Sequence, residues 1–423
     1  MYGKKGQAEY HLQKFDNSLS SLNHAIMLNV HLKNFEALGR NHLDVANYYE
    51  YHTNHSKQID HIEKAIEDFK LAKSPISLID AQMDLAWMLK KQGQYEVAIE
   101  TYQQIIQSAK HIDDKKGQMI AINNMASTYN IMNNSTEAIR LAKIGLDLTL
   151  ELGEGQSIAN SYSLLSSLYQ QEYNSIKALK MIEESLKFQL KTKGFKHFPP
   201  KMLNLSYLLV QTYQFIKADE LLKTTLDFAE ALGSKGGTVT IKLYQGMNAA
   251  HQNNWNQAQQ ILDKGLKRYD KTTLTYKKPM TMAYLALAYY FTNHRNQAQS
   301  MAHDVLDNSK SNKNAKAIAA LALAHIYNFM ENNTETEKWI VKTEKLINKK
   351  WLFEYQLLLM LKSNIAQTNT TSIQKDLYDE INQIVSEMAM LAENAKINAD
   401  IFNDLISKVN SHVKNLKLTK KAK

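Results

Sequence analysis

The feature that most constrains this chain is a spacing of 40 residues between equivalent positions. Steps of 40 from one alanine return an alanine each time, at Ala98, Ala138, Ala178, Ala218, Ala258 and Ala298. Eight residues after this position the chain has only leucine or isoleucine, at Ile26, Ile66, Ile106, Leu146, Leu186, Leu226, Leu266, Leu306 and Leu346. A fixed period of this kind indicates repeated units that stack on their neighbours.

Each period reads as two amphipathic helices joined by a turn. The segment 81–106 shows this most clearly, because apolar residues at helical spacing flank the turn at Gly93. Where two helices cross closely only a small side chain fits, which explains the alanine. The aliphatic residue eight positions later lies on nearly the same helix face. The period therefore predicts a stack of helix–turn–helix units.

The pattern resembles the tetratricopeptide repeat (TPR) family. The matching residues in the clearest unit are Leu85, Ala86, Leu89, Gly93, Tyr95, Ala98, Tyr102, Ile105 and Ile106. The family's usual unit has about 34 residues, and its closing proline is absent here. The longer unit resembles the subgroup found in bacterial signal-transduction regulators, peptide-pheromone sensors, spindle-orientation adaptors and kinesin light chains. The resemblance covers residues 3–350 and implies an all-α, right-handed α-solenoid.

Two regions follow from this register. Residues 1–350 are predicted to form about nine repeats, of which the first is truncated. The missing N-terminal cap indicates either a degenerate cap or a piece of a longer chain. Residues 351–423 are predicted to form a degenerate tenth helix pair (351–394), a closing helix (396–417) and a basic tail. The apolar stripe of the closing helix is expected to cover the final repeat, and a coiled coil that pairs two copies is the alternative.

Glycine and proline are predicted to mark helix ends. Glycines in the left-handed conformation should end second helices, and prolines should lie at the start of first helices. The glycines are Gly153, Gly194 and Gly233, and the prolines are Pro75, Pro200 and Pro279.

Composition excludes several classes of protein. The chain has no cysteine, which excludes disulfides and thiolate chemistry. Its net charge of +9 comes from 51 basic residues interspersed with 42 acidic ones, and this mixture indicates a solvated surface rather than a nucleic-acid site. No apolar run is long enough to span a bilayer, and the N-terminus lacks the apolar centre of a signal peptide. We therefore expect a cytoplasmic protein, or a periplasmic one if the chain is a fragment.

No catalytic or metal-binding motif is present. The glycines at 233–237 lack the residues of a phosphate loop. His52, His55 and His61 are the densest histidine cluster, but without a placed third ligand they are read as turn histidines rather than a zinc site. The lysine-rich end lacks interleaved aromatic residues and is read as a solubilising tail. We expect neither an enzyme nor a cofactor.

The family resemblance places ligands on the inner, first-helix face. In the second to fifth repeats this register selects polar residues around one tryptophan. The candidates are Arg40, Asn47, Trp87, Asn123, Ser127, Asn130, Asn160, Ser163, Ser167 and Gln170. Side chains that donate and accept hydrogen bonds suit an extended peptide, with the tryptophan as an apolar anchor. A solvated groove of no specific function would also be polar, so both interpretations stay open.

In the later repeats the residues at the same inner positions are apolar or aromatic, namely Tyr207, Met247, Leu287 and Tyr290. An apolar groove of this size rarely faces water. Either a partner's amphipathic helix fills it or the chain's own C-terminal helices fold back into it, and we favour the second because it needs no partner.

The function predicted from these observations is a non-catalytic scaffold that binds a protein or peptide segment in its groove, with no small-molecule substrate. The alternative is a sensory module of a larger bacterial signalling protein such as a diguanylate cyclase, a kinase or a transcription regulator.

Overall fold

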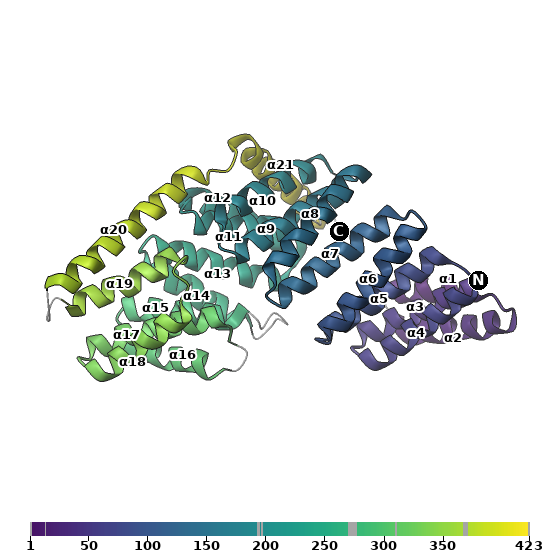
Figure 1. Ribbon diagram of the computed structural model, residues 1–423, viewed down its shortest axis with the longest axis horizontal. Helices are drawn as coiled ribbons and strands as arrows, with labels where there is room; N and C mark the ends of the chain where they lie inside the picture. Colours follow the sequence, from purple (N-terminus) through teal and green to yellow (C-terminus); the bar gives the residue numbers. More distant parts are fainter. Residues whose placement is uncertain are drawn as a thin grey trace. The chain divides into compact units, whose positions relative to one another are not determined.

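The computed structural model describes residues 2–12, 14–192, 195, 198–269, 277–308, 311–366 and 371–421. Within these ranges the chain forms α-helices and no strand (Figure 1). The first helices of successive pairs are α1 (Tyr2–His11), α3 (Phe35–Tyr51), α5 (Pro75–Lys91), α7 (Lys115–Ile131), α9 (Gly155–Gln171), α11 (Phe198–Gln211), α13 (Lys235–His251), α15 (Lys278–Phe291), α17 (Lys313–Phe329) and α19 (Leu352–Ala366). The second helices are α2 (Phe15–His31), α4 (His55–Leu71), α6 (Tyr95–His111), α8 (Ser135–Leu152), α10 (Ser175–Lys191), α12 (Phe215–Leu232), α14 (Trp255–Tyr269), α16 (Arg295–Asp307), α18 (Asn333–Leu346) and α20 (Thr371–Asn394), and α21 (Ala399–Lys421) follows them.

The buried small residue of each second helix confirms the repeat that the sequence predicts. All six ladder alanines, from Ala98 to Ala298, are fully buried, and each lies in the first turn of an even-numbered helix. Ser18 is also fully buried at the equivalent position of α2. The aliphatic ladder is less enclosed, because Leu186 is fully buried while Leu146 and Leu226 are half-buried. The small residue is thus the point of closest packing in each unit.

Most of the described turns up to α16 share one backbone conformation, repeated every 20 residues. One residue of each of them has a positive φ, at Lys33, Thr53, Lys73, Gly93, Asp113, Asn133, Gly153, Tyr173, Tyr213, Gly233, Asn253 and Asn293, and Glu331 has one in the α17–α18 turn. Turns inside a repeat and turns between repeats are therefore alike. Gly153 and Gly233 confirm the predicted glycine positions, whereas Gly194 lies outside the described residues. Most of these turns use residues other than glycine, which the sequence analysis did not foresee.

Asparagine and related side chains cap many of the helices that follow these turns. The side chain accepts a hydrogen bond from the backbone N–H three residues later, as for Asn34 with Ala37 at 3.2 Å and Asp114 with Gly117 at 2.9 Å. Such a bond satisfies one of the free donors at a helix N-terminus. Pro75 and Pro279 occupy the first turns of α5 and α15, as predicted, and Pro200 lies in the first turn of α11.

The described helices form two compact units, Met1–Leu168 (unit 1) and Tyr169–Lys423 (unit 2). This division differs from the boundary at residue 350, which marks where the ladder ends and stays a prediction about the sequence repeat. In unit 2 the largest apolar core runs from α10 through α18 and includes the C-terminal helices.

The C-terminal helix α21 does not cover the final repeat, and that expectation was wrong. It packs on α12 and α10, the second helices of two earlier repeats (Figure 1). Its predicted stripe is buried there, with Leu405 and Val409 fully enclosed. The His412 ring also stacks on Phe195, with centroids 3.9 Å apart. An apolar stripe shows that a helix needs a partner surface, but not which one. The side chains of the basic tail beyond residue 417 lie outside the description.

The shared turn conformation predicts opposite changes in stability for substitutions at two of these turn positions, Gly93 and Thr53. Gly93 has a φ of 82°, and no atom lies within 4 Å of a Cβ placed there, so Gly93→Ala should suffer only backbone strain. We expect it to lower the free energy of unfolding by about 1 kcal/mol. Thr53, a β-branched residue at a φ of 54°, should show the opposite, with Thr53→Gly raising stability by up to about 1 kcal/mol. Urea unfolding would measure both, and Gly93→Asn should lose less than Gly93→Ala because asparagine tolerates this conformation. Equal losses for the two Gly93 variants would contradict this account.

Candidate functional site

The polar candidate residues lie on the first helices of unit 1. Arg40, Asn47 and Asn160 are exposed on α3 and α9. The half-buried candidates are Trp87 on α5, Asn123, Ser127 and Asn130 on α7, and Ser163 and Ser167 on α9. Gln170 falls in unit 2, where its amide donates to Asn204 Oδ1 at 3.3 Å.

Trp87 presents a partly covered indole. The Lys91 amine lies 4.0 Å from the centroid of its ring, and the same amine lies 3.6 Å from a Glu50 carboxylate oxygen. The Trp87 side chain also packs against the core cluster of α3 to α5. A cation over an indole face is favourable. A peptide that uses Trp87 as an anchor would therefore have to share the ring with Lys91 or displace it.

Several candidate polar groups already have partners within unit 1. The Asn123 amide donates to Ser161 Oγ at 3.3 Å. Its Oδ1 has no partner and would lie 2.1 Å from a Cβ at Gly145. Asn123 therefore packs between helices rather than facing solvent. Arg40 pairs with Glu36, with the Nη2–Oε1 distance at 2.7 Å.

The side chains of Ser167 and Asn160 also have partners. Ser167 Oγ donates to the Ser163 carbonyl oxygen at 3.1 Å, and Gln156 donates to Asn160 Oδ1 at 3.1 Å. Asn130 Oδ1 is buried without a hydrogen-bond partner. Asn47 is thus the exposed candidate whose side chain is most accessible to a ligand.

Acidic residues of the same helices were not among the binding candidates selected from the sequence. Desolvation by the surrounding helices, then repulsion from Asp80 and Glu50, raise the pKa of Asp84 to about 6. Desolvation and repulsion from Asp114 raise the pKa of Asp80 as well. Asp84 lies one residue beyond the register used to choose candidates, which is why it was not selected, whereas Asp80 occupies the same register position as Arg40 and Asn160. The two carboxylates make part of this face acidic.

The histidine cluster is arranged differently from its order in the sequence. His61 on α4 pairs with His42 on α3, with their Nδ1 atoms 2.9 Å apart, and not with His55. His52 Nδ1 lies 2.8 Å from the Tyr48 carbonyl oxygen. Among the described residues, no group of three or more His, Asp or Glu side chains is placed to hold a metal ion. His42 and His61 therefore form a packing contact inside one hairpin.

This contact gives a prediction about pH. Burial lowers the pKa of His42 from 6.5 to about 4, so the unfolded chain takes up a proton that the folded chain excludes, and stability falls as pH falls through this window. Burial and the Glu67 carboxylate raise the pKa of Asp68 from 3.8 to about 6. The folded chain therefore takes up a proton before the unfolded chain does, and the contribution of Asp68 to stability rises as pH falls through nearly the same window. The two effects oppose each other.

Replacing either His42 or Asp68 should reveal the effect of the other residue on the pH dependence of stability. Between about pH 7 and 4.5, Asp68→Asn should lose on the order of 1 kcal/mol more unfolding free energy than the wild type. His42→Gln should lose less than the wild type. Urea unfolding at a series of pH values measures both, and parallel curves for the three proteins would refute the assignment.

In unit 2 the apolar candidates are covered. Leu287 is fully buried and Met247 is 4% exposed, while Tyr207 and Tyr290 are half-buried at the same core. The covering element is α19, which contacts α17 and whose Phe353 ring stacks on His251 with centroids 4.2 Å apart. The covering helix α19 belongs to the predicted tenth helix pair, whereas α21 lies on the second helices α10 and α12.

The contact between α19 and the groove contains a buried polar group. Glu354 of α19 is 1% exposed, and its Oε1 lies 3.3 Å from His251 Nε2. The Tyr284 hydroxyl donates to the same oxygen. Burial and the Glu354 carboxylate raise the pKa of Tyr284, so this hydroxyl keeps its proton and can donate. No signal in the sequence paired these three residues, which are up to 103 positions apart.

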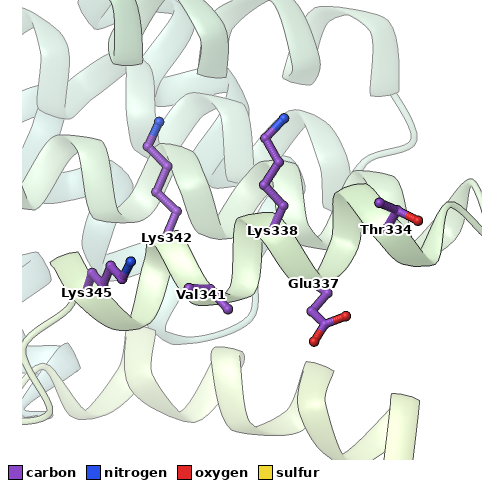
Figure 2. A pocket seen from close by; sticks show the side chains of 6 residues that line it. All are labelled: Thr334, Glu337, Lys338, Val341, Lys342 and Lys345. Atoms are coloured by element: carbon purple, nitrogen blue, oxygen red, sulfur yellow. The ribbon is translucent and has the colours of Figure 1, made fainter.

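A shallow hollow lies on α18. Its volume is about 570 Å³, and its lining residues are Thr334, Glu337, Lys338, Val341, Lys342 and Lys345. Figure 2 shows Lys338 and Lys342 pointing to one side of the helix and Glu337 to the other. Because all of these side chains come from one helix, the hollow is an open, basic surface rather than an enclosed site.

Comparisons with known proteins agree with this architecture. The family model for soluble NSF attachment protein, SNAP, matches residues 7–121, less than half of the chain. A search of curated protein sequences finds no match. Among solved structures, the apo form of RapI aligns with a TM-score of 0.51 and 12% identity, over 64% of this chain and 98% of that one.

Two further structures align over most of the chain. A Rap protein complexed with competence and sporulation factor has a TM-score of 0.54 and 11% identity, over 81% of this chain and 98% of that one. A signal transduction ATPase with numerous domains (STAND), with a tetratricopeptide repeat sensor, from Pyrococcus horikoshii has a TM-score of 0.54 and 15% identity, over 82% of this chain and 54% of that one.

The helix pairs, the buried ladder and these alignments define the fold as a TPR-type α-solenoid. Identities of 11–15% establish the fold and nothing more specific. Among the described helices, none has both the length and the apolarity needed to cross a membrane.

Proposed function

We propose that the chain is a non-catalytic scaffold whose unit 1 binds an extended peptide or protein segment along its first helices. The observation that carries this proposal is the contrast between the two units. In unit 2 the first-helix face is filled by α19, whereas in unit 1 the same register leaves Asn47 exposed and Trp87 half-exposed. A face that is polar, repeated and uncovered suits a ligand whose own backbone supplies donors and acceptors.

Two residues are the strongest candidates for the proposed binding. Asn47 offers an exposed amide, and Trp87 offers an indole edge beside Lys91. Asp84 and Asp80 add negative charge on the same helix as Trp87. Asn123 is a poorer choice, since its side chain is engaged between helices. One of the aligned structures is a Rap protein described in complex with competence and sporulation factor.

Variants of Asn47 and Trp87 test this proposal. Peptides would first be selected on the wild-type chain from a phage-displayed library. Trp87→Ala should then raise Kd by about 30-fold or more, as expected for an aromatic anchor. Asn47→Ala should raise Kd by about fivefold, the value of one hydrogen bond. Fluorescence anisotropy measures both constants.

The matched control is Gln103→Ala, an exposed side chain on the second helix α6, which should leave Kd unchanged. Thermal melts check that each variant is folded, since Trp87 also packs on the core. Unchanged affinity in folded Trp87→Ala and Asn47→Ala would rule out this face as the binding site.

A second candidate function is a sensory module within a larger signalling protein. The observation that favours it is the alignment of 82% of this chain with 54% of the STAND protein, which is described as having a TPR sensor. A native reading frame that extends into a cyclase, kinase or regulator domain would support it. Pairing of two copies through the C-terminal helices stays a prediction, which light scattering on the purified chain would test.

A further inference from the structure

The helix α19 is buried on nearly all sides, as are the first helices α15 and α17. Leu358 is fully buried and Leu359 is 1% exposed, although these neighbours point about 100° apart on the helix. The exposed residues are Met360, at 47% exposed, and Asn364. One side of α19 meets the first helices of unit 2, and another side meets α20. The first-helix face of unit 2 is thus occupied by a helix of the same chain.

The N-terminal end of α19 is held by groups from several repeats. The Lys350 amine donates to the Glu172 carbonyl oxygen at 3.3 Å, and the Trp351 ring lies 6.4 Å from that of Tyr173. Phe353 stacks on His251. These partners lie in turns and at helix ends, so α19 begins along one edge of the repeats.

Glu354 is the only acidic residue of α19. Its carboxylate meets His251 and Tyr284, lies close enough to Tyr207 and Tyr213 to raise their pKa values, and is otherwise surrounded by apolar side chains. Burying a charge has a large desolvation cost, and an apolar residue of similar size would often be at least as stable. The carboxylate therefore contributes mainly to register, because only one placement of α19 brings it to both partners.

We propose that α19 is a built-in ligand, occupying in cis a site that accepts an apolar helix with one carboxylate directed at His251 and Tyr284. When α19 is released, the same site binds a partner helix of this chemistry. The site is separate from the unit 1 face of the proposed function, so either can fail without the other.

The connections of α19 are consistent with its release. The short segment 347–351 joins it to α18, where the repeat ladder ends. On its other side, α20 leads to an anchor that does not involve the groove. There the Gln214 amide donates to the Ala395 carbonyl oxygen at 2.7 Å, and the Lys217 amine donates to the Ile397 carbonyl oxygen at 3.3 Å. α19 and α20 can therefore leave the groove while α21 stays on α10 and α12.

The test uses the whole chain and a fluorescent peptide of residues 350–366. Leu358→Asp places an unpaired carboxylate at a fully buried position and should expel α19. We expect this variant to bind the peptide at least about tenfold more tightly than the wild type does. Met360→Asp, on the exposed side of the same helix, is the control and should behave as the wild type. Fluorescence anisotropy gives the affinities, and circular dichroism verifies the fold.

A second pair of peptides tests the carboxylate. The peptide with Glu354→Lys should bind Leu358→Asp at least about tenfold more weakly than the unchanged peptide, and the peptide with Met360→Lys should bind equally well. Absence of peptide binding to the folded Leu358→Asp chain would overturn the proposal. Equal binding of the Glu354→Lys and unchanged peptides would overturn the role of the carboxylate.

If Leu358→Asp does not fold, Glu354→Gln in the whole chain gives an independent readout. Hydrogen exchange should become faster in 352–366 while α15 stays protected, and unchanged exchange in 352–366 would again overturn the proposal. Library-selected peptides should still bind unit 1 of either variant, which separates this result from a failure of the proposed function.

Discussion

The rest of this structure depends on the close crossing of the two helices in each unit. At that crossing the second helix carries a side chain no larger than alanine in most repeats, and Ala98, Ala138 and Ala178 are fully buried there. A larger residue would push the helices apart and shift every later unit, because a repeat contacts only its neighbours. As far as α16, most of the described turns have one backbone conformation and recur at intervals of 20 residues, so that each helix face recurs in register.

This regular register places residues of different polarity on the first-helix faces of the two units. On the first helices of unit 1 it presents polar and acidic groups such as Asn47 and Asp84. On the first helices of unit 2 it presents apolar side chains such as Met247 and Leu287, which would be costly to expose to water. The C-terminal segment removes this cost by placing α19 on the apolar face and α21 on the second helices α10 and α12.

Some side chains make contacts that the repeat register does not predict. Asn123 occupies a predicted inner position, yet its amide lies in the space left by Gly145 and bonds Ser161. His61 meets His42 across the α3–α4 hairpin, 19 residues away. A backbone period places Cα atoms on a face, but rotamers respond to the local space that neighbouring residues leave open.

The sequence by itself determined the helix pairs, their period and the polarity of each face, because these depend on spacing within about 40 residues. It also determined that the apolar half of the inner face needs a cover. Only the tertiary structure decided that α19 supplies the cover, that α21 lies on α10 and α12, and that Glu354 meets His251 and Tyr284. Apolar stripes attract one another without direction, so the surface that a stripe covers is chosen by shape and chain connection.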